Sequence, residues 1–206
     1  MDASKAFDRV NHKTLFDKLH IRKAPPCFIG LIMNWYSKLY SCVRWNGVFS
    51  DFFKVSCGVR QGGIMSPILF NLYVDDLIEL LGDSGYGCYV SKTFIGCIMY
   101  ADDLILVSPT ISGLQEMINI CSNFSVKHDI VFNPKKTVSM LVGNSVYCSP
   151  ELSLHTNGSP IAWVSRLKYL GIYFVNKKAL CLDVREVKRK FCASCNSVLC
   201  QIGVCG

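Results

Sequence analysis

The sequence has no long apolar run. Its longest stretch without a charged residue is 191–206, which holds 16 residues and includes glycine, serine, asparagine and glutamine. Spanning a bilayer takes about 20 mostly apolar residues. We therefore expect no transmembrane helix and no membrane partner. The chain also shows no internal repeat and no low-complexity linker.

Charged residues are scarce as well. They make up 18% of the 206 residues, against about 25% in an average globular domain. With 50% hydrophobic residues the chain can bury a sizeable core, which argues against disorder. Twelve cysteines are scattered, mostly through apolar runs. We interpret them as reduced thiols of a protein in the cytosol or nucleus, not as a disulfide framework.

Basic residues are nearly absent from the middle of the chain. Residues 61–126 hold one lysine and seven acids, whereas residues 1–60 and 127–206 carry net charges of +6 and +7. Two interpretations stay open. The charges form solvated faces without a common function, or the basic thirds hold a polyanion while the acids hold a metal.

Apolar periodicity predicts alternating helices and short strands. Helices are expected at about 13–23, 28–40, 67–81, 112–127 and 184–202. The pair Ser66–Pro67 is typical of a helix N-cap followed by its first residue. Strands are expected at 43–45, 48–49, 52–59, 94–99, 104–107, 130–132, 138–142, 152–155, 161–164 and 167–175, with turns at 46–47 and 157–158. This pattern favours an α+β fold with helices packed on a mainly antiparallel sheet.

The pattern Tyr-x-Asp-Asp-Leu occurs twice, at 73–77 and 100–104. Asp75 and Asp76 fall inside an expected helix, where adjacent side chains diverge by about 100°, so we interpret them as surface charge. Asp102 and Asp103 fall between two apolar strands. We expect them at a hairpin tip, from which their carboxylates can project towards a partner acid; a solvated turn is the alternative.

Two further acids, Asp2 and Asp8, stand at the start of the chain. Clustered carboxylates repel one another unless a cation neutralises them, and a ligand set made only of oxygens favours Mg²⁺. Two Mg²⁺ ions about 4 Å apart suit in-line phosphoryl transfer, in which one activates the attacking hydroxyl and the other stabilises the leaving pyrophosphate.

Five ordered segments resemble the reverse transcriptase domain of non-LTR (LINE-type) retrotransposons, over about residues 1–190. The segments are Asp2-x-x-x-x-Phe7, then Arg60–Gln61–Gly62–Gly63 with Ser66–Pro67–Ile68–Leu69–Phe70–Asn71, then Tyr100–Ala101–Asp102–Asp103, Phe132–Asn133–Pro134–Lys135–Lys136–Thr137 and Leu167–Lys168–Tyr169–Leu170–Gly171–Ile172. The resemblance implies a polymerase palm, that is, a ferredoxin-like antiparallel sheet with packed helices, at 1–175. It also implies a fingers-side segment at about 13–57 and the start of a thumb helix at 176–206. We expect the upstream fingers and the rest of the thumb to be absent from this chain.

The resemblance also implies residue roles at the reaction centre. Asp2, Asp102 and Asp103 would hold two Mg²⁺ ions, for which Mn²⁺ could substitute, with Asp103 secondary. Phe7 would lie under the incoming sugar and exclude a 2′-hydroxyl, so that dNTPs are selected; a core aromatic is the alternative. Lys136, or else Lys135, would approach the pyrophosphate, with a solvated turn lysine as the alternative.

Further residues would contact the template and primer. Gln61 and Gly62 would touch the template and the nascent pair, and glycine permits close backbone approach. Asn71 would face the site, and Arg60 would reach a phosphate or stay solvated. Asp8 also fits the family pattern, and we interpret it as structural.

The C-terminal third adds a basic group. Lys168 lies in the fifth segment, at the base of the thumb, and would contact nucleic acid. Lys188, Arg189 and Lys190 would contact duplex backbone or form the solvated face of a helix. Four cysteines at 192, 195, 200 and 205 have the spacing of a zinc knuckle. Against this, Phe191, Cys195, Val198 and Ile202 continue a helical apolar stripe that begins at Val184. A helix would separate the thiols, so we expect no zinc.

The function implied by the resemblance is RNA-directed DNA polymerisation in retrotransposition. A primer 3′-hydroxyl would attack the α-phosphate of a dNTP on an RNA template, in the cytoplasm and nucleus. RNA template, DNA primer and dNTPs are the expected partners, and the sequence does not indicate an oligomeric state. One alternative is a catalytically inactive nucleic-acid-binding remnant of such a polymerase; another is a palm like that of group II intron maturases.

Overall fold

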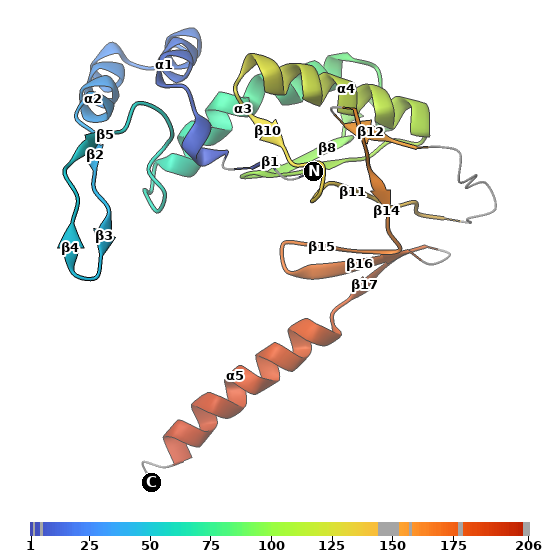
Figure 1. Ribbon diagram of the computed structural model, residues 1–206. Helices are drawn as coiled ribbons and strands as arrows, with labels where there is room; N and C mark the ends of the chain where they lie inside the picture. The colour runs from blue at the N-terminus through green and yellow to red at the C-terminus, as the bar shows by residue number, and fades with distance from the viewer. Residues whose placement is uncertain (2, 5, 144–152, 157, 177–178, 204–206) are drawn as a thin grey trace. The chain divides into compact units, whose positions relative to one another are not determined.

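The computed structural model describes residues 1, 3–4, 6–143, 153–156, 158–176 and 179–203 (Figure 1). The chain forms two compact units, one of residues 1–137 with 155–159 and the other of residues 138–154 with 160–206. The fold is mixed α/β with small sheets. No helix in the described part of the chain is long and apolar enough to cross a bilayer.

The first unit contains most of the helices. Its elements are β1 (Ala3–Ser4), a 3-10 turn (Phe7–Arg9), α1 (His12–Ile21), α2 (Pro26–Ser37), β2 (Tyr40–Ser41), β3 (Arg44–Trp45), β4 (Val48–Phe49), β5 (Phe53–Lys54), α3 (Ser66–Asp83), β6 (Tyr89–Val90), β7 (Thr93–Phe94), β8 (Cys97–Tyr100), β9 (Asp103–Leu106), α4 (Ile111–Lys127), β10 (Val131–Phe132) and β12 (His155–Thr156).

The second unit combines short strands with the long helix α5. Its elements are β11 (Val138–Ser139), β14 (Ala162–Trp163), β15 (Arg166–Tyr169), β16 (Ile172–Asn176), β17 (Leu180–Asp183) and α5 (Arg185–Gly203). Strand β13 (Ser159–Pro160) pairs with β12, and the division of the chain into units falls within β13. β11 and β14 are parallel, and β15, β16 and β17 form an antiparallel sheet.

Four short strands of the first unit lie next to one another. β8 and β9 form an antiparallel hairpin, and β1 pairs antiparallel with β10 through Ala3 and Phe132. Two backbone hydrogen bonds join these pairs: Ala3 N–Asp102 O at 3.1 Å and Leu104 N–Met1 O at 2.9 Å. The resulting neighbour order is β10, β1, β9, β8, so segments about 100 residues apart in sequence meet beside Asp102.

The core of the first unit forms where α3 and α4 contact each other and α4 contacts β10. Along α3 the buried side chains recur every three or four residues, which gives the helix one apolar face. The largest fully buried side chains of this core come from α3, β9, α4 and β10: Phe70, Tyr73, Leu77, Leu81, Leu104, Met117 and Phe132. Burial raises the pKa of the Cys121 thiol to about 12, and the ten cysteines of the described part are free thiols.

Most helix predictions are confirmed, with changes at their ends. α1, α4 and α5 match the ranges expected from periodicity. α2 begins at Pro26, two residues earlier than expected, because proline fits the first turn of a helix. The predicted cap at Ser66 is wrong: Met65 takes the N-cap position, and the Ser66 hydroxyl instead donates a hydrogen bond to the Arg60 carbonyl.

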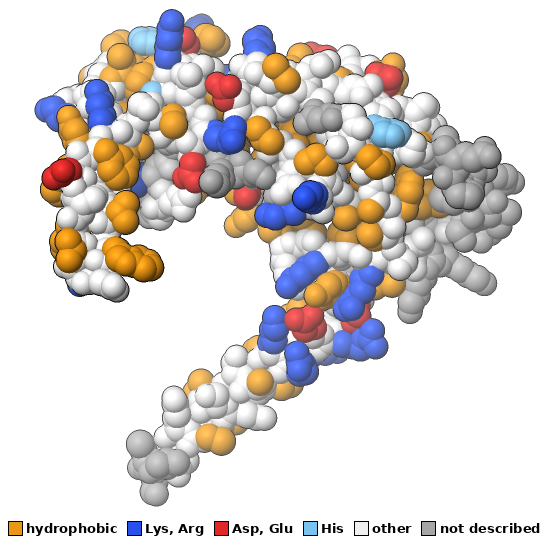
Figure 2. All heavy atoms as spheres, viewed as in Figure 1, with side chains coloured by type: hydrophobic (Ala, Val, Ile, Leu, Met, Phe, Trp, Pro, Cys, Tyr) orange, Lys and Arg blue, Asp and Glu red, His pale blue; other side chains and the backbone are white. Residues whose placement is uncertain are grey.

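Two hairpins show where the strand predictions hold and where they fail. Asn46 and Gly47 both have positive φ, as a two-residue turn between β3 and β4 requires. β5 pairs with β2 and lengthens this ribbon, on which hydrophobic side chains gather at the surface (Figure 2). The single strand predicted at 167–175 is wrong. Leu170 and Gly171, also at positive φ, turn the chain between β15 and β16.

Candidate active site

The second Tyr-x-Asp-Asp-Leu segment forms the hairpin tip that the sequence predicts. Tyr100 pairs with Asp103, so Ala101 and Asp102 make a two-residue turn. Ala101 has a φ of 52°, in the left-handed region, where a Cβ costs about 1–2 kcal/mol. Residues with backbone strain of this kind are found more often at functional sites. The tip is thus held in one conformation by the strands on either side of it.

Asp102 and Asp103 are both half-buried at this tip. Within the described part of the chain, no hydrogen bond or ion pair engages the Asp102 carboxylate, although its backbone carbonyl accepts from Ala3 N. Asp103 is the first residue of β9. The structure therefore presents the Asp102 carboxylate at the hairpin tip and that of Asp103 at the first residue of β9.

The third predicted metal ligand, Asp2, lies outside the described residues. Its two chain neighbours are described: Met1 O accepts from Leu104 N, and Ala3 N donates to Asp102 O. No group of three His, Cys, Asp or Glu side chains suited to a metal occurs among the described residues, a set that leaves Asp2 out.

Phe7 is held against the core. Its ring stacks on Phe70 of α3, with 4.7 Å between the centroids and 18° between the planes, and the side chain is half-buried. The backbone carbonyl of Phe7 accepts from Val59 N at 2.7 Å. The alternative of a core aromatic is supported by this stack, while the exposed part of the ring leaves the predicted sugar contact as a proposal.

Arg60, Gln61, Gly62 and Gly63 form a turn that leads into α3. Gly63 N bonds to Arg60 O at 3.0 Å, and Gly62 has a φ of 78° with open space where a Cβ would lie. Arg60 and Gln61 are exposed, and so is Asn71 on α3. The second predicted segment thus presents its polar groups to solvent on a turn that is fixed to the helix.

A hydrogen bond that sequence reasoning missed joins Asp8, the residue after the first predicted segment, to Gln61 of the second. The Gln61 side-chain amide donates to the Asp8 carboxylate at 2.8 Å. The backbone at Gly58 also packs closely on that of Asp8, because a Cβ on Gly58 would lie 2.9 Å from the Asp8 backbone. The only hint of this bond in the sequence is the acid that follows Phe7. Its partner, Gln61, lies 53 residues further along the chain.

Lys135 and Lys136 lie in a turn after β10. Asn133 organises this turn: its side-chain oxygen accepts from Lys135 N at 3.0 Å, and its carbonyl accepts from Lys136 N at 3.2 Å. Thr137 also donates to that carbonyl through its hydroxyl, at 2.8 Å. Both lysine side chains are exposed, and the structure does not distinguish between them.

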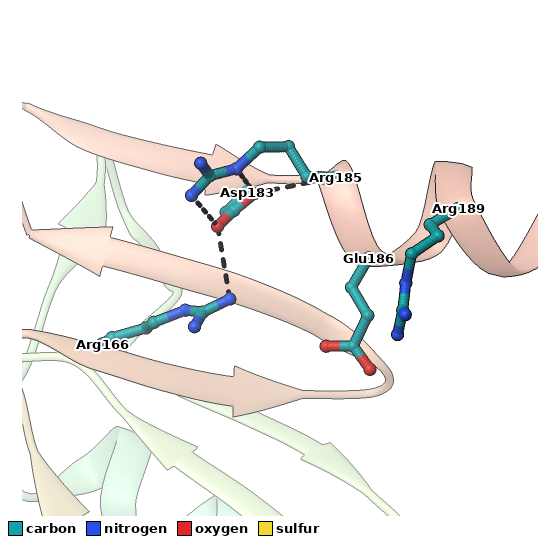
Figure 3. A pocket seen from close by; sticks show the side chains of 5 residues that line it. All are labelled: Arg166, Asp183, Arg185, Glu186 and Arg189. Atoms are coloured by element: carbon teal, nitrogen blue, oxygen red, sulfur yellow. Dashed lines mark hydrogen bonds and ion pairs between the residues drawn. The ribbon is translucent and has the colours of Figure 1, made fainter.

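The second unit gathers basic side chains at the start of α5. A cleft of about 360 Å³ is lined by Arg166, Asp183, Arg185, Glu186 and Arg189 (Figure 3). Asp183 pairs with Arg185 at 2.8 Å and with Arg166 at 3.2 Å. Hydrogen bonds from Arg185, aided by Arg166, hold the pKa of Asp183 far below its usual range. The acid is therefore charged and fixes two arginines.

The predicted basic residues of this unit are all exposed or half-exposed. The Lys168 ammonium lies 5.6 Å from the centre of the Tyr173 ring. Lys190 pairs with Glu186 at 3.1 Å, whereas Lys188 and Arg189 form no ion pair within the described part of the chain. Three of the four knuckle cysteines, at 192, 195 and 200, lie on the continuous helix α5, and Cys205 lies outside the described residues.

Comparison with known proteins decides the family. The profile of the family described as reverse transcriptase (RNA-dependent DNA polymerase) matches residues 1–174. The chain belongs to the reverse transcriptase family. The resemblance inferred from the five segments is therefore confirmed, and this reverse transcriptase chain is an enzyme by family.

The relatives are proteins of non-LTR retrotransposons. The chain is 33% identical, over 84% of its length and 17% of the relative's, to the retrovirus-related Pol polyprotein of the type-2 retrotransposable element R2DM of Drosophila melanogaster. It is 27% identical to a type-1 element R2 polyprotein of Popillia japonica (84% of this chain, 30% of the relative). It is 25% identical to the RNA-directed DNA polymerase from the mobile element jockey of Drosophila funebris (84% and 19%). This reverse transcriptase chain thus spans less than a third of each of these relatives.

Proposed function

We propose that this chain carries the polymerase centre of a retroelement and extends a DNA primer on an RNA template with dNTPs. The observation that carries the proposal is the backbone pairing beside the hairpin tip. Met1 and Ala3, which flank Asp2 in sequence, bond to Leu104 and Asp102. The described neighbours of Asp2 in sequence therefore belong to the same small region of sheet as Asp102 and Asp103.

The residues at the tip fit a hard divalent cation. Their donors are carboxylate oxygens, which suit Mg²⁺, and no described cation neutralises the Asp102 carboxylate. Asp2, Asp102 and Asp103 would hold two Mg²⁺ ions, with Mn²⁺ as a substitute. When bound, such ions would activate the primer hydroxyl and stabilise the leaving pyrophosphate.

The remaining residues would position substrates. The stack on Phe70 would hold the Phe7 ring where the incoming sugar lies, so that a 2′-hydroxyl collides with it. The bond to Asp8 would hold the turn that carries Gln61, which would touch the template together with Gly62. Arg60 and Asn71 would add polar contacts from the same turn and from α3.

Positive groups would contact the phosphates. The Asn133-centred turn would direct Lys136, or Lys135, towards the pyrophosphate, where an ammonium stabilises the developing charge. Lys168, Lys188, Arg189 and Lys190 would contact the nucleic-acid backbone from the second unit.

The neighbour order β10, β1, β9, β8, with α3 and α4 as the connecting helices, supports a polymerase palm. In this proposal the palm covers residues 1–175 with a fingers-side segment at about 13–57, and residues 176–206 begin a thumb. Action at nuclear DNA after synthesis in the cytoplasm follows from the family and stays a prediction.

Primer extension tests the proposal. The full chain is given an RNA template, an annealed DNA primer, Mg²⁺ and dNTPs, beside the variants Asp102→Asn and Asp103→Asn. Loss of groups that merely support a metal ligand costs about 10–100-fold. We therefore expect Asp102→Asn, which removes a ligand itself, to lower the rate by more than about a hundredfold.

Asp75→Asn is the matched control, because it alters the other Tyr-x-Asp-Asp-Leu segment. Asp75 forms a surface ion pair with Arg22, and such pairs contribute little, so extension should be unchanged. If the chain binds RNA but incorporates no nucleotide, the proposal is wrong and the chain is the inactive nucleic-acid-binding remnant.

A further inference from the structure

The ribbon between α2 and α3 exposes an unusual amount of aromatic surface. We call residues 40–54, which comprise β2 to β5, the arm. No residue of the arm is buried. Five of its aromatic side chains are at least half exposed, and Trp45 reaches 77%. The five are Tyr40, Trp45, Phe49, Phe52 and Phe53. These rings do not serve the core of the unit.

Cations stand directly opposite two of these rings. Tyr40 pairs with Lys54 across β2 and β5, and Arg44 pairs with Phe49 across β3 and β4. Residues directly opposite in an antiparallel pair share a face of the ribbon. The Arg44 guanidinium accordingly lies 5.4 Å from the centre of the Phe49 ring. The arm thus places flat rings and positive charges side by side.

The charge around the arm favours an anionic partner. Asp51 is the one acid in residues 40–54, and the first 60 residues carry a net charge of +6. Exposed aromatic rings stack on nucleic-acid bases whatever the sequence, and neighbouring cations neutralise the phosphates. In a duplex the base faces are stacked on one another, so a partner that uses these rings has to be single-stranded.

We propose that the arm binds single-stranded RNA. The identity of that RNA as unpaired template rests on the proposed function. Bases would stack on Trp45 and Phe49, while Arg44 and Lys54 contact phosphates.

The root of the arm is closed by one backbone hydrogen bond, and the segment between the arm and Arg60 is anchored by another. Val55 N bonds to Leu39 O at 2.9 Å, and Val59 N bonds to Phe7 O at 2.7 Å. Only five residues separate Lys54 from Arg60. The arm that would bind RNA is therefore only a few residues away in sequence from the turn proposed to touch the template.

RNA binding without catalysis tests the inference. The full chain is titrated into a labelled, unstructured 20-nucleotide RNA in EDTA without dNTPs, and anisotropy gives Kd. Stacking of one base gives about a 5- to 150-fold effect on alanine substitution. We expect Trp45→Ala/Phe49→Ala to raise Kd by at least about tenfold. Tyr86→Ala, an exposed aromatic outside the arm, should leave Kd unchanged.

Salt dependence tests the phosphate interactions separately. For a single strand, each phosphate that the protein no longer neutralises reduces the steepness of log K against log salt by about 0.7. Arg44→Gln should reduce the steepness by about that amount, whereas Lys127→Gln, an exposed lysine at the end of α4, should not. Circular dichroism of all variants should match the parent, because none of the substituted residues is buried.

Three results would overturn the inference: an RNA affinity that does not depend on the arm, arm-dependent binding of single-stranded DNA but not RNA, or arm variants that change the sedimentation of the RNA-free chain. The last would assign the arm to self-association. These outcomes are separate from the polymerase test, since binding is measured without metal or dNTP. A chain that extends primers with an arm-independent Kd would keep the proposed function and lose this inference.

Discussion

Lys18 is a buried cation where α1, α3 and α4 meet, and its replacement gives a sharp test of what holds the first unit together. Its ammonium donates to the Tyr73 carbonyl at 2.6 Å and pairs with Asp76 at 2.9 Å. It also lies 5.6 Å from the Tyr73 ring centre and 5.8 Å from that of Phe124. The lysine side chain is 8% exposed, whereas that of Asp76 is 47% exposed.

The exposures predict which part of the side chain stabilises the fold. Because Asp76 stays hydrated when the cation is removed, Lys18→Met leaves no orphaned buried charge. It loses a charged hydrogen bond of about 1.5–3 kcal/mol but also avoids the cost of burying an ammonium, several kcal/mol. We therefore expect Lys18→Met to change stability by less than about 1 kcal/mol. Lys18→Ala removes three buried methylenes at about 0.8 kcal/mol each and leaves a cavity, so we expect about 3 kcal/mol.

Hydrogen exchange of the α1 and α3 amides is the suitable measurement, since it reads this unit apart from the second one. Lys13→Met is the matched control, because Lys13 is exposed on the same helix, and it should stay within about 0.5 kcal/mol. If Lys18→Met destabilises as much as Lys18→Ala, the reasoning is refuted, and the charge itself stabilises this junction.

Two further predictions concern the same unit. Burial lowers the pKa of His128, whose ring stacks on that of Phe124 with 3.8 Å between the ring centroids. The imidazole therefore binds a proton less readily in the folded chain than in the unfolded chain. The stability present above about pH 6.5 should be lost as the pH falls below it, and His128→Phe should flatten this dependence in thermal unfolding from about pH 5 to 7.5. Gly58→Ala should destabilise by more than about 2 kcal/mol, since it adds a contact at 2.9 Å with the Asp8 backbone to a strained φ of +89°. Gly47→Ala, with a φ of +82° and open space around the Cβ, should cost only the φ strain of about 1–2 kcal/mol; equal losses for the two variants in thermal unfolding would count against the close packing.

Local features of the fold could be predicted from the sequence. α4 and the 100–104 hairpin follow from apolar periodicity over segments long enough to fix its phase. The Asn46–Gly47 turn follows from its two turn residues. The Leu170–Gly171 turn could not be predicted in this way, because a single glycine inside an apolar run also fits a continuous strand.

Long-range features could not be predicted from the residues alone. The pairing of Ala3 with Phe132, and its bond to Asp102, joins segments that share no local pattern. The Gln61–Asp8 bond is of the same kind. Such interactions depend on how helices and strands pack, and in this chain only the family resemblance indicated that the first and third segments belong together.

The repeated Tyr-x-Asp-Asp-Leu segment shows how structure decides the use of one motif. In α3, Tyr73 is fully buried, and the two acids are taken up by Arg22 and Lys18. At the hairpin, Tyr100 is 63% exposed, and within the described residues the Asp102 carboxylate has no protein partner. Leu77 and Leu104 are buried in both, so the leucine anchors either structure while the phase of the backbone decides where the acids point. The same five-residue pattern therefore yields two acids paired with cations in or next to α1 in one setting and a candidate ligand pair in the other. This is why Asp75→Asn is a sharper control for Asp102→Asn than any acid chosen by exposure.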